Sequence, residues 1–394
     1  MRKKRINIAQ LHWGFPPIIG GVETHLTLLL PTFVKWGHAV SLLTGSCEGV
    51  KTRYVYKGVG IWRSPLMDLN WLSERGIEGI EEDVDRLFRD FFRSVKPDII
   101  HVHNMHYFSE IHAQKLADFV LKKKIPLILT AHNVWDDSLF LELSKEINWS
   151  HIIAVSHFIK RELIGVGYSE KKITVVHHGI DTKMFRPNLD TKRIQKRFPQ
   201  LKDRRVIFHP ARIGLAKGCD TGVKALSLIK KHFPDIILVM AGAKNIIDWG
   251  STQQRDIAYI VELIRTLKLE KNVLIDVFSL KEVAQIYSLA KLCIYPSSSP
   301  EPFGLTMLEA LSSGKPIIVT NMGGMPEIIQ DGINGFVIRV RDFEALASRV
   351  IRLLEDDILR ERLGSTGRQM LLGQYRKERM ARDILTIYEK ILGR

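Results

Sequence analysis

The chain has 394 residues, 45% of them hydrophobic, and a formal net charge of +15. This length exceeds one ordinary domain, so two domains are expected. No apolar run approaches the roughly 18 residues that a membrane-spanning helix requires, and the run 6–11 is too short for the apolar part of a signal peptide. The positive charge suits phosphorylated ligands or an anionic membrane surface. Nucleic acid is disfavoured, because the basic residues are spread out and no nucleic-acid motif occurs.

The three cysteines, Cys47, Cys219 and Cys293, are odd in number and lack the spacing of a metal site. We interpret them as reduced thiols, which predicts a cytoplasmic protein. Basic clusters at 122–124 and within 192–205 are compatible with peripheral contact to the inner face of an anionic membrane. A solvated basic face explains the same residues equally well.

In the first half, short apolar runs alternate with helical patterns, which predicts a parallel sheet built from strand–helix–strand units. We expect strands at 6–11, 39–44, 98–103, 126–131, 151–155 and 173–176. We expect helices at 22–36, 78–95, 110–122 and 156–165. The stretch 46–75 is interpreted as variable loops.

A second series of strands begins at 206–210 and continues near 236–241, 273–277, 292–296, 316–320 and 335–338. The charged stretch 183–205 contains two prolines and is interpreted as an interdomain linker. Ser279 and Glu282 predict a capping box for one of the intervening helices. The last segment, 374–392, predicts a long amphipathic helix with no strand after it.

The segment E-P-F-G-L-T-M-L-E at 301–309 follows a predicted strand and opens a predicted helix. Free N–H groups at the start of that helix, helped by its dipole, would bind a phosphate. Glu301 and Glu309 flank those donors, an arrangement that suits a ligand with phosphate in the middle and hydroxyls at both ends. A nucleotide sugar has this layout. Taken alone, a Glu-Glu pair of this kind is more often a solvated face than a site.

The segment P-A-R-I-G-L-A-K-G at 210–218 follows the first strand of the second half. Arg212 and Lys217 lie five residues apart on this glycine-containing loop, where they are well placed to hold a diphosphate. Near the N-terminus, Gly20 and Gly21 indicate a close backbone approach to a phosphate or sugar, or a positive φ. The G-x-G-x-x-G fingerprint is absent, so a nicotinamide cofactor is not supported.

Histidines gather at predicted strand ends. His101, His103 and His106 form an H-x-H-x-x-H run that resembles a metal cluster. No Asp, Glu or Cys nearby completes a ligand set, so we expect no metal there. His132 ends a buried strand facing the expected ligand cleft, where it would hydrogen-bond a sugar or phosphate. A structural histidine is the alternative.

Together these segments resemble the retaining glycosyltransferases of family 4, which have the GT-B architecture. The matching segments are G-G-V-E-T-H (20–25), T-A-H-N (130–133), A-V-S-H-F-I-K (154–160), H-H-G-I-D (177–181), A-R-I-G-L-A-K-G (211–218), E-P-F-G-L-T-M-L-E-A (301–310) and G-G-M-P-E-I-I-Q-D-G (323–332). The resemblance implies an α/β fold of two Rossmann-like domains that face a central cleft. The expected domains are 1–185, which binds the acceptor, and 186–373, which binds the donor, with the helix at 374–394 packing back onto the first domain.

The resemblance also implies roles for the matching residues of the second domain. Glu301 would bond the hydroxyls of the donor sugar, and Glu309 those of the ribose. Arg212 and Lys217 would clamp the diphosphate and neutralise the leaving group. The backbone donors that would contact sugar and phosphate belong to Phe303, Gly304 and Leu305.

In the first domain, the resemblance places Gly20 and Gly21 against the donor phosphate or the acceptor, and His132 near the transferred sugar. Two positions depart from the family pattern. Asn133 stands where the family commonly has Asp, and His178 stands where it commonly has Asn. His178 would therefore alter contacts to the acceptor or between the domains.

The implied activity is retaining transfer of a hexose-type sugar from a nucleotide-diphosphate sugar, UDP- or GDP-linked, to a hydroxyl acceptor that is a sugar, a lipid-linked molecule or a small molecule. Fixed cationic side chains and the helix start would stabilise the departing diphosphate, so no cofactor is required and no divalent metal is obligatory. A nucleotide-sugar epimerase or hydrolase on the same scaffold is one alternative. A non-catalytic nucleotide-sugar-binding protein is the other.

Overall fold

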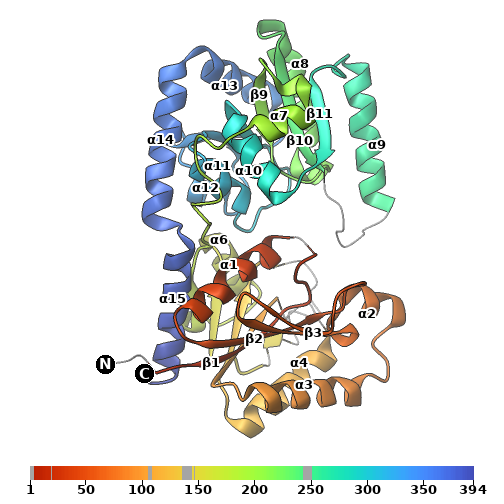
Figure 1. The fold of residues 1–394 in the computed structure, drawn as a ribbon, viewed down its shortest axis with the longest axis vertical. Coiled ribbons are helices and arrows are strands. Elements are labelled where there is room, and N and C mark those ends of the chain that lie inside the picture. The colour runs from red at the N-terminus through yellow and green to blue at the C-terminus, as the bar shows by residue number, and fades with distance from the viewer. Residues whose placement is uncertain (1–3, 19, 105–108, 135–143, 146, 243–250) are drawn as a thin grey trace. The chain divides into compact units, whose positions relative to one another are not determined.

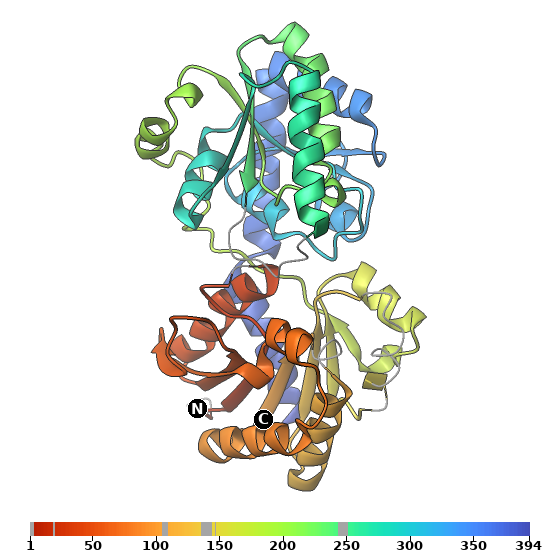
Figure 2. The same cartoon turned by 90° about the vertical axis from the view of Figure 1, so that its right-hand side faces the viewer.

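The computed structural model describes residues 4–18, 20–104, 109–134, 144–145, 147–242 and 251–394. The chain forms two compact units, Met1–Gly179 with Lys377–Arg394 (unit 1) and Ile180–Arg376 (unit 2). Each unit is a sheet with helices against it (Figures 1 and 2). The chain passes between the units at Gly179/Ile180 and Arg376/Lys377, whereas the sequence predicted boundaries at 185/186 and 373/374.

Unit 1 contains an eight-stranded sheet in the order β3-β4-β2-β1-β5-β6-β7-β8. Its strands are β1 (Asn7–Leu11), β2 (Ala39–Gly45), β3 (Arg53–Tyr56), β4 (Val59–Ser64), β5 (Ile99–His103), β6 (Leu127–Ala131), β7 (His151–Ala154) and β8 (Ile173–Val175). All neighbours are parallel except β3 and β4. The strand order reverses at β1, which lies between β2 and β5, and ligands bind at such switch points in open α/β sheets.

The stretch 46–75 was interpreted as loops, and that interpretation was wrong. The β3–β4 hairpin and the helix α2 (Leu69–Arg75) occupy much of it. Lys57 and Gly58 connect the two strands with φ angles of 48° and 86°, as a two-residue hairpin turn requires. The four residues of β3 are half-buried or exposed at the sheet edge. Their side chains therefore carry little of the apolar periodicity by which strands are predicted.

The other helices of unit 1 pack against this sheet. They are α1 (Gly21–Lys35), α3 (Glu81–Val95), α4 (Glu110–Lys123), α6 (His157–Gly165) and α15 (Lys377–Ile391), with short 3-10 turns η1 (Pro65–Met67) and η3 (Glu170–Lys172). The apolar face of α15 is buried in the same core as α1, with Met380, Ile384 and Tyr388 at 0–1% exposure. The C-terminal helix is thus part of the first unit's core.

Unit 2 contains a parallel six-stranded sheet in the order β11-β10-β9-β12-β13-β14. Its strands are β9 (Arg205–His209), β10 (Ile236–Gly242), β11 (Val273–Val277), β12 (Leu292–Tyr295), β13 (Ile317–Thr320) and β14 (Gly335–Ile338). Its helices are α7 (Lys192–Arg197), α8 (Cys219–His232), α9 (Ser251–Thr266), α10 (Leu280–Leu289), α11 (Leu305–Ser312), α12 (Met325–Ile328), α13 (Phe343–Glu355) and α14 (Asp357–Gln374), with 3-10 turns η4 (Pro199–Leu201) and η5 (Leu215–Lys217). The predicted capping box of Ser279 and Glu282 is present at the start of α10.

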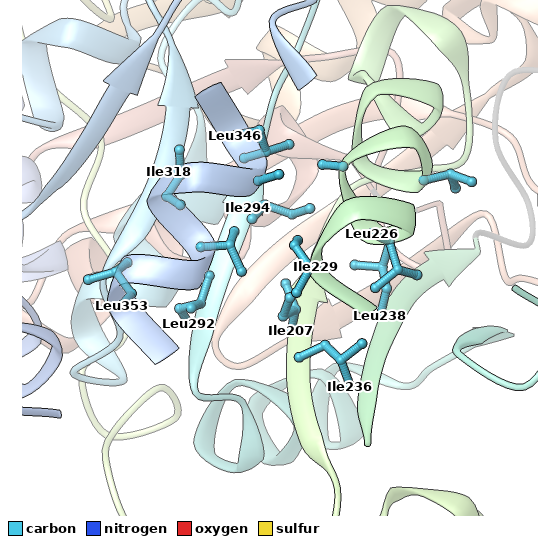
Figure 3. Packing of buried hydrophobic residues seen from close by; sticks show 14 of the residues in the cluster. Ile207, Leu226, Ile229, Ile236, Leu238, Leu292, Ile294, Ile318, Leu346 and Leu353 are labelled. Atoms are coloured by element: carbon cyan, nitrogen blue, oxygen red, sulfur yellow. The ribbon is translucent and has the colours of Figure 1, made fainter. Parts of the chain in front are cut away.

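One face of this sheet packs against α8 and α13 (Figure 3). Ile207, Leu238 and Ile294 project from β9, β10 and β12 toward Leu226 of α8 and Leu346 of α13, and each is 2% exposed or less. Burying apolar area contributes about 25 cal/mol per Å². This core fixes the strand ends and the helix starts that carry the site described below.

The stretch 183–205 is not an interdomain linker, because it belongs to unit 2 and includes α7 and η4. Ile194 of α7 is fully buried. Arg197 pairs with Asp276 at 3.0 Å and with Glu282 at 2.8 Å. Some of the charges of this stretch therefore form ion pairs within unit 2. In the part of the chain that the structure describes, no helix is both long and apolar enough to cross a membrane.

Candidate functional site

The loop between β9 and α8 brings Lys217 to Glu301. The Lys217 Nζ donates to Glu301 Oε2 at 2.9 Å, and the hydroxyl of Tyr295 donates to the same oxygen. Tyr295 is the last residue of β12, so two neighbouring strands of the sheet deliver the two donors. The side chains of Lys217 and Glu301 are 29% and 16% exposed, which leaves both within reach of a ligand.

The β9–α8 loop is fastened to the segment that follows β12. Ser297 Oγ donates to the carbonyl of Ala216 at 2.9 Å, and Ser298 Oγ donates to that of Leu215 at 3.0 Å. Gly218 has φ +72°, and a Cβ there would lie 1.8 Å from the carbonyl oxygen of Pro296. Only glycine allows this approach, so the glycine after Lys217 sets the position of the lysine.

The segment from Glu301 to the start of α11 is held in the same way. Gly324 N–H donates to the Glu301 carbonyl at 2.8 Å. Gly323 has φ +59°, and a Cβ there would meet that carbonyl oxygen at 2.3 Å. Gly304, with φ +87°, precedes the first residue of α11, and no side chain caps the helix there among the described residues. The first N–H groups of a helix have no acceptor within it, so the start of α11 offers donors to an anion beside Lys217.

Two cations, Lys217 and Arg212, lie near the carboxylate of Glu301. Burial raises the pKa of Glu301, but the Lys217 ammonium and the hydrogen bonds from Lys217 and Tyr295 outweigh it, so the pKa is lowered from its ordinary value. Arg212 is exposed on the same loop and close enough to lower that pKa further. An ionised carboxylate at this position accepts hydrogen bonds from hydroxyl groups, and the two cations attract phosphate.

Glu309 lies on α11 in a different environment. It is 9% exposed, and its Oε2 accepts a hydrogen bond at 2.9 Å from Tyr287. Burial raises the pKa of Glu309 to about 7, and the Tyr287 hydroxyl opposes the shift. The side chain is therefore poised between its neutral and ionised forms near neutral pH, where hydroxyl donors on a ligand favour the ionised form.

Unit 2 thus brings together Lys217 and Glu301 of the residues that the sequence proposed for the donor, with Arg212 on the loop of Lys217 and Glu309 on α11. Phe303 is 1% exposed, and its ring is tilted by 54° against that of Tyr375 at a centroid distance of 6.1 Å, so any contact from it to a ligand is through its backbone. The sequence missed Tyr295 and Tyr287 as partners of the two glutamates. Tyr295 lies within the run 292–296 and Tyr287 lies on a helical face, and neither position carries a signal beyond that of an ordinary core residue.

In unit 1, Gly20 and Gly21 precede and begin α1. Neither takes a positive φ, so that alternative was wrong. A Cβ on Gly20 would lie 2.3 Å from Oε2 of Glu23, whereas a Cβ on Gly21 would meet nothing within 4 Å. The close approach at Gly20 is therefore to the chain's own carboxylate. Glu23 is 5% exposed and lies 3.0 Å from Nε2 of His12, a pair that the sequence did not predict.

His132 follows β6 in unit 1 and is 6% exposed. Its Nε2 lies 2.9 Å from Nδ1 of His103, at the end of β5. His178 meets His25 of α1, with 2.9 Å between their Nδ1 atoms. Of the H-x-H-x-x-H run, His101 and His103 are buried in the sheet, and His106 lies outside the described residues. The histidines thus form one cluster drawn from several elements.

Hydrogen bonds assign the tautomers along this cluster. The amide of Gln10 donates to Tyr388 O at 3.1 Å, so the Tyr388 hydroxyl donates to Nδ1 of His101. Gln10 Oε1 accepts from Nε2 of His103 at 2.7 Å, which leaves Nδ1 of His103 as an acceptor. His132 therefore carries its proton on Nε2 and has a lone pair on Nδ1.

Burial lowers the pKa of His101, His103, His132 and His178 well below the ordinary value, and neighbouring histidines add to the effect. Burial likewise lowers the pKa of His25 to about 3, with a contribution from His12. All five are neutral at pH 7, so each presents one N–H and one lone pair. The cluster therefore acts through hydrogen bonds or ligation and adds no positive charge.

The chain contains one Asp-x-Asp triplet, Asp83–Val84–Asp85, whose two carboxylates could in principle face a cation. It lies in the first turns of α3, where Asp83 is exposed and pairs with Arg86 at 3.6 Å, and Asp85 pairs with Arg89 at 3.0 Å. These pairs are ordinary contacts along a helix surface.

Two family models together match most of the chain. The model described as Glycosyltransferase Family 4 matches residues 19–184, and the model described as Glycosyl transferases group 1 matches residues 190–370. The chain is 27% identical over 395 residues to the N-acetyl-alpha-D-glucosaminyl L-malate synthase of Bacillus anthracis, with 95% of each chain covered.

Solved structures show the same fold. A glycosyltransferase from Rickettsia africae matches with a TM-score of 0.80 at 22% identity, covering 98% of this chain and 99% of that one. The Anabaena protein HepE in complex with UDP-glucose matches with a TM-score of 0.77 at 18% identity, covering 98% and 100%. Both likenesses extend over the whole length of the two units.

Proposed function

Because the chain belongs to the family 4 type of glycosyltransferases and has their GT-B fold of two Rossmann-like domains, we propose that it transfers a hexose-type sugar, with retention of configuration, from a UDP- or GDP-linked donor to a hydroxyl acceptor. A nucleotide-sugar donor is supported by the UDP-glucose bound to the structural neighbour HepE. The observation that carries the proposal is the contact of Lys217 with Glu301 beside the uncapped start of α11.

In this proposal the diphosphate of the donor occupies the space beside Lys217, Arg212 and the first N–H groups of α11. When the bond to the sugar breaks, negative charge develops on the departing diphosphate, and fixed donors already aimed at that charge lower the barrier. The backbone groups of Phe303, Gly304 and Leu305 contribute donors. No divalent metal is assigned to this step, because cationic side chains and backbone N–H groups of the chain would stabilise the diphosphate in its place.

Glu301 and Glu309 are assigned to the sugar and the ribose of the donor. Glu301, ionised and held by Lys217 and Tyr295, accepts hydrogen bonds from sugar hydroxyls. Glu309, with a pKa of about 7, accepts those of the ribose. In unit 1, Gly21 leaves open space beside the start of α1, and His132 offers an acceptor at Nδ1. We assign these two residues to the transferred sugar or the acceptor.

We assign the protein to the cytoplasm, since its three cysteines are all free thiols, two of them buried. Peripheral contact with an anionic membrane stays a prediction. Lys122 and Lys123, which are exposed in the last turn of α4, would make this contact.

The test compares nucleotide release from UDP-, GDP- and ADP-sugars, with and without a panel of hydroxyl acceptors. Lys217→Ala should lower turnover at least a hundredfold while the fold is retained, since removal of one fixed donor to a developing charge costs about 10²–10³ in rate. Lys224→Ala is the matched control, because Lys224 pairs with Asp220 on the surface of α8 and is expected to leave turnover unchanged.

The same assay separates the alternatives. An epimerase would convert the donor sugar without releasing nucleotide, and a hydrolase would release it equally well without an acceptor. A binding protein would be stabilised by the nucleotide sugar and release nothing with any acceptor. Near-normal turnover of the Lys217→Ala variant would remove the leaving-group role from this site.

A further inference from the structure

Three buried histidines of unit 1 converge although they come from separate parts of the chain. His25 lies on α1, His103 ends β5 and His132 follows β6. One ring nitrogen from each lies within 4.8 Å of the others. They are 2%, 0% and 6% exposed, so the side chains meet inside the unit and not on its surface.

Two polar atoms of this group are left over. Nε2 of His25 and Nδ1 of His132 are buried and have no hydrogen-bond partner among the residues that the structure describes. Buried polar atoms of native proteins are nearly always satisfied by protein, water or a ligand. The ion proposed below would take up Nε2 of His25, so this atom indicates that something absent from the polypeptide completes the cluster.

We propose that His25, His103 and His132 form a binding site for one borderline divalent transition-metal ion, of which Zn²⁺ is the representative, with a fourth position open to water or an external ligand. Neutral imidazole is a preferred ligand of Zn²⁺, Co²⁺ and Ni²⁺. The side chains are neutral at pH 7, so the lone pairs are available without removal of a charge.

Two of the three rings are held through the nitrogen that faces away from the ion. His103 donates its Nε2–H to Gln10 Oε1 at 2.7 Å, and Gln10 is held in turn by Tyr388. His25 uses Nδ1 toward His178, which leaves Nε2 for an ion. A ligating histidine typically donates its other N–H to a carbonyl-type oxygen, as His103 does here, which fixes the ring and its tautomer.

The ion would take the place of the hydrogen that now lies between His103 and His132. Nδ1 of His103 and Nε2 of His132 are 2.9 Å apart and share one hydrogen. Zn–N bonds are about 2.0–2.1 Å long, which puts tetrahedral ligand atoms roughly 3.4 Å apart. Ligation would therefore widen the His103–His132 distance and bring the His25 nitrogen, which lies within 4.8 Å of both, to the same spacing. On ligation the His132 proton moves from Nε2 to Nδ1, and no proton leaves the protein. The Glu23 carboxylate, bonded to His12, places negative charge in the same region.

This site goes beyond the transfer reaction, although it shares His132 with the proposed function. With the ion bound, Nδ1 of His132 carries the proton and would donate to the sugar or acceptor instead of accepting from it. The H-x-H-x-x-H run suggested a metal cluster along one segment, for which no ligand set could be completed. The tertiary structure recruits His25 and His132 from other elements. The run itself therefore supplies one of the three ligands among the described residues.

The direct test is metal binding to protein without an affinity tag, first stripped by a chelator and then equilibrated with Zn²⁺ or Co²⁺. We expect about one equivalent bound after dialysis, measured by elemental analysis. Co²⁺ should give the intense visible bands of a tetrahedral site, and Zn²⁺ should compete them away. Less than a tenth of an equivalent for the folded wild-type protein would overturn the proposal.

Variants locate the ion. His25→Gln and His103→Gln should each lower affinity at least tenfold. His112→Gln is the matched control, because His112 is also buried in unit 1 but both its ring nitrogens are bonded to oxygens, Ser109 Oγ and the Leu66 carbonyl, each at 2.7 Å. Unchanged affinity in both ligand variants would place the ion elsewhere and reject the site.

A second measurement needs no variant and covers the case in which these substitutions impair folding. X-ray absorption of the zinc-loaded wild-type protein should show the multiple-scattering pattern of about three imidazoles. Zinc surrounded by oxygen or sulfur ligands instead of imidazole nitrogens would reject the proposal. Neither measurement uses transfer activity, so failure of this site and failure of the proposed function are distinguishable.

Discussion

Nζ of Lys217 lies 2.9 Å from Oε2 of Glu301, 84 residues later in the chain. Two parallel strands that neighbour each other, β9 and β12, carry the loops that bring them together. The pair joins the cation proposed for the diphosphate to the carboxylate proposed for the sugar. Displacing one partner therefore removes a charge-assisted hydrogen bond from the other.

The coupling of this pair can be measured by a double-mutant cycle. Lys217→Met should raise the pKa of Glu301, because burial then acts without the ammonium that opposes it. We expect the double variant Lys217→Met/Glu301→Gln to lose less stability than the two single losses added together, with a coupling free energy of about 1–3 kcal/mol. Chemical unfolding of the four proteins gives this value. Additive losses would show that the pair is not energetically linked.

Gly218 should tolerate no side chain. It has φ +72°, and the added Cβ would lie 1.8 Å from the Pro296 carbonyl oxygen. Gly218→Ala is therefore expected to lower the free energy of unfolding by about 2–4 kcal/mol and to displace Lys217. Gly165→Ala is the control, since a Cβ there meets nothing within 4 Å and the site is in α6. Equal stabilities of the two variants would contradict the strained position of Gly218.

Glu309 predicts a pH dependence of stability. Its pKa is about 7 in the folded state against 4.5 ordinarily, because burial disfavours the charged form. Below pH 4.5 the group is neutral in both states. Between pH 4.5 and 7 the unfolded chain loses its proton first, so the group lowers stability progressively, by up to about 3 kcal/mol above pH 7. Glu309→Gln should remove this loss, as urea unfolding between pH 5 and 8 would show.

Glu282 provides the contrast. Burial raises its pKa, but Arg197 and the capping interactions of Ser279 outweigh this and lower it to about 2. Its stabilising effect is therefore present above its ordinary pKa and lost only as the pH falls toward 2. Glu282→Gln should destabilise the protein at neutral pH, opposite in sign to Glu309→Gln. A common sign for both substitutions at pH 8 would argue against the assigned environments.

Nucleotide binding should release protons if Glu309 contacts ribose hydroxyls, because a carboxylate that accepts hydrogen bonds has a lowered pKa. At pH 7, where about half of the Glu309 side chains are protonated, up to roughly half a proton should leave per nucleotide bound. Calorimetry in buffers of different ionisation enthalpy measures this number. Glu309→Gln should abolish the release, and persistence of the release in that variant would place its source elsewhere.

Tyr388 connects α15 to the histidine cluster. Tyr388→Phe leaves Nδ1 of His101 and the amide of Gln10 without this partner. Because a buried polar group without a partner costs about 1–3 kcal/mol, we expect a loss of that size in urea unfolding. Tyr56→Phe, on the half-exposed edge strand β3, should change stability by less than about 0.5 kcal/mol. If Tyr388→Phe lowers the free energy of unfolding no more than Tyr56→Phe does, the Tyr388 hydroxyl does not stabilise the cluster.

Much of the fold followed from the sequence alone, because each buried strand is a compact apolar run with helical periodicity on either side. The strands near 6–11, 98–103 and 292–296 and the capping box of Ser279 and Glu282 are local patterns, and the structure contains them. The β3–β4 hairpin was missed, since an exposed edge strand buries too little to leave an apolar pattern. The stretch 183–205 was misjudged because its charges find partners that lie far away in the sequence, such as Asp276.

For the site, the sequence determined which residue types stand at strand ends and helix starts, and hence that Arg212, Lys217, Glu301 and Glu309 belong to one unit. Only the tertiary structure decided the partners of each. It set Tyr295 against Glu301 and Tyr287 against Glu309, and it gathered histidines from several elements around His103. Local patterns report on neighbours along the chain, whereas burial and charge pairing depend on neighbours in space. Environment-dependent properties such as the opposite pKa shifts of Glu301 and Glu309 therefore follow only from the folded molecule.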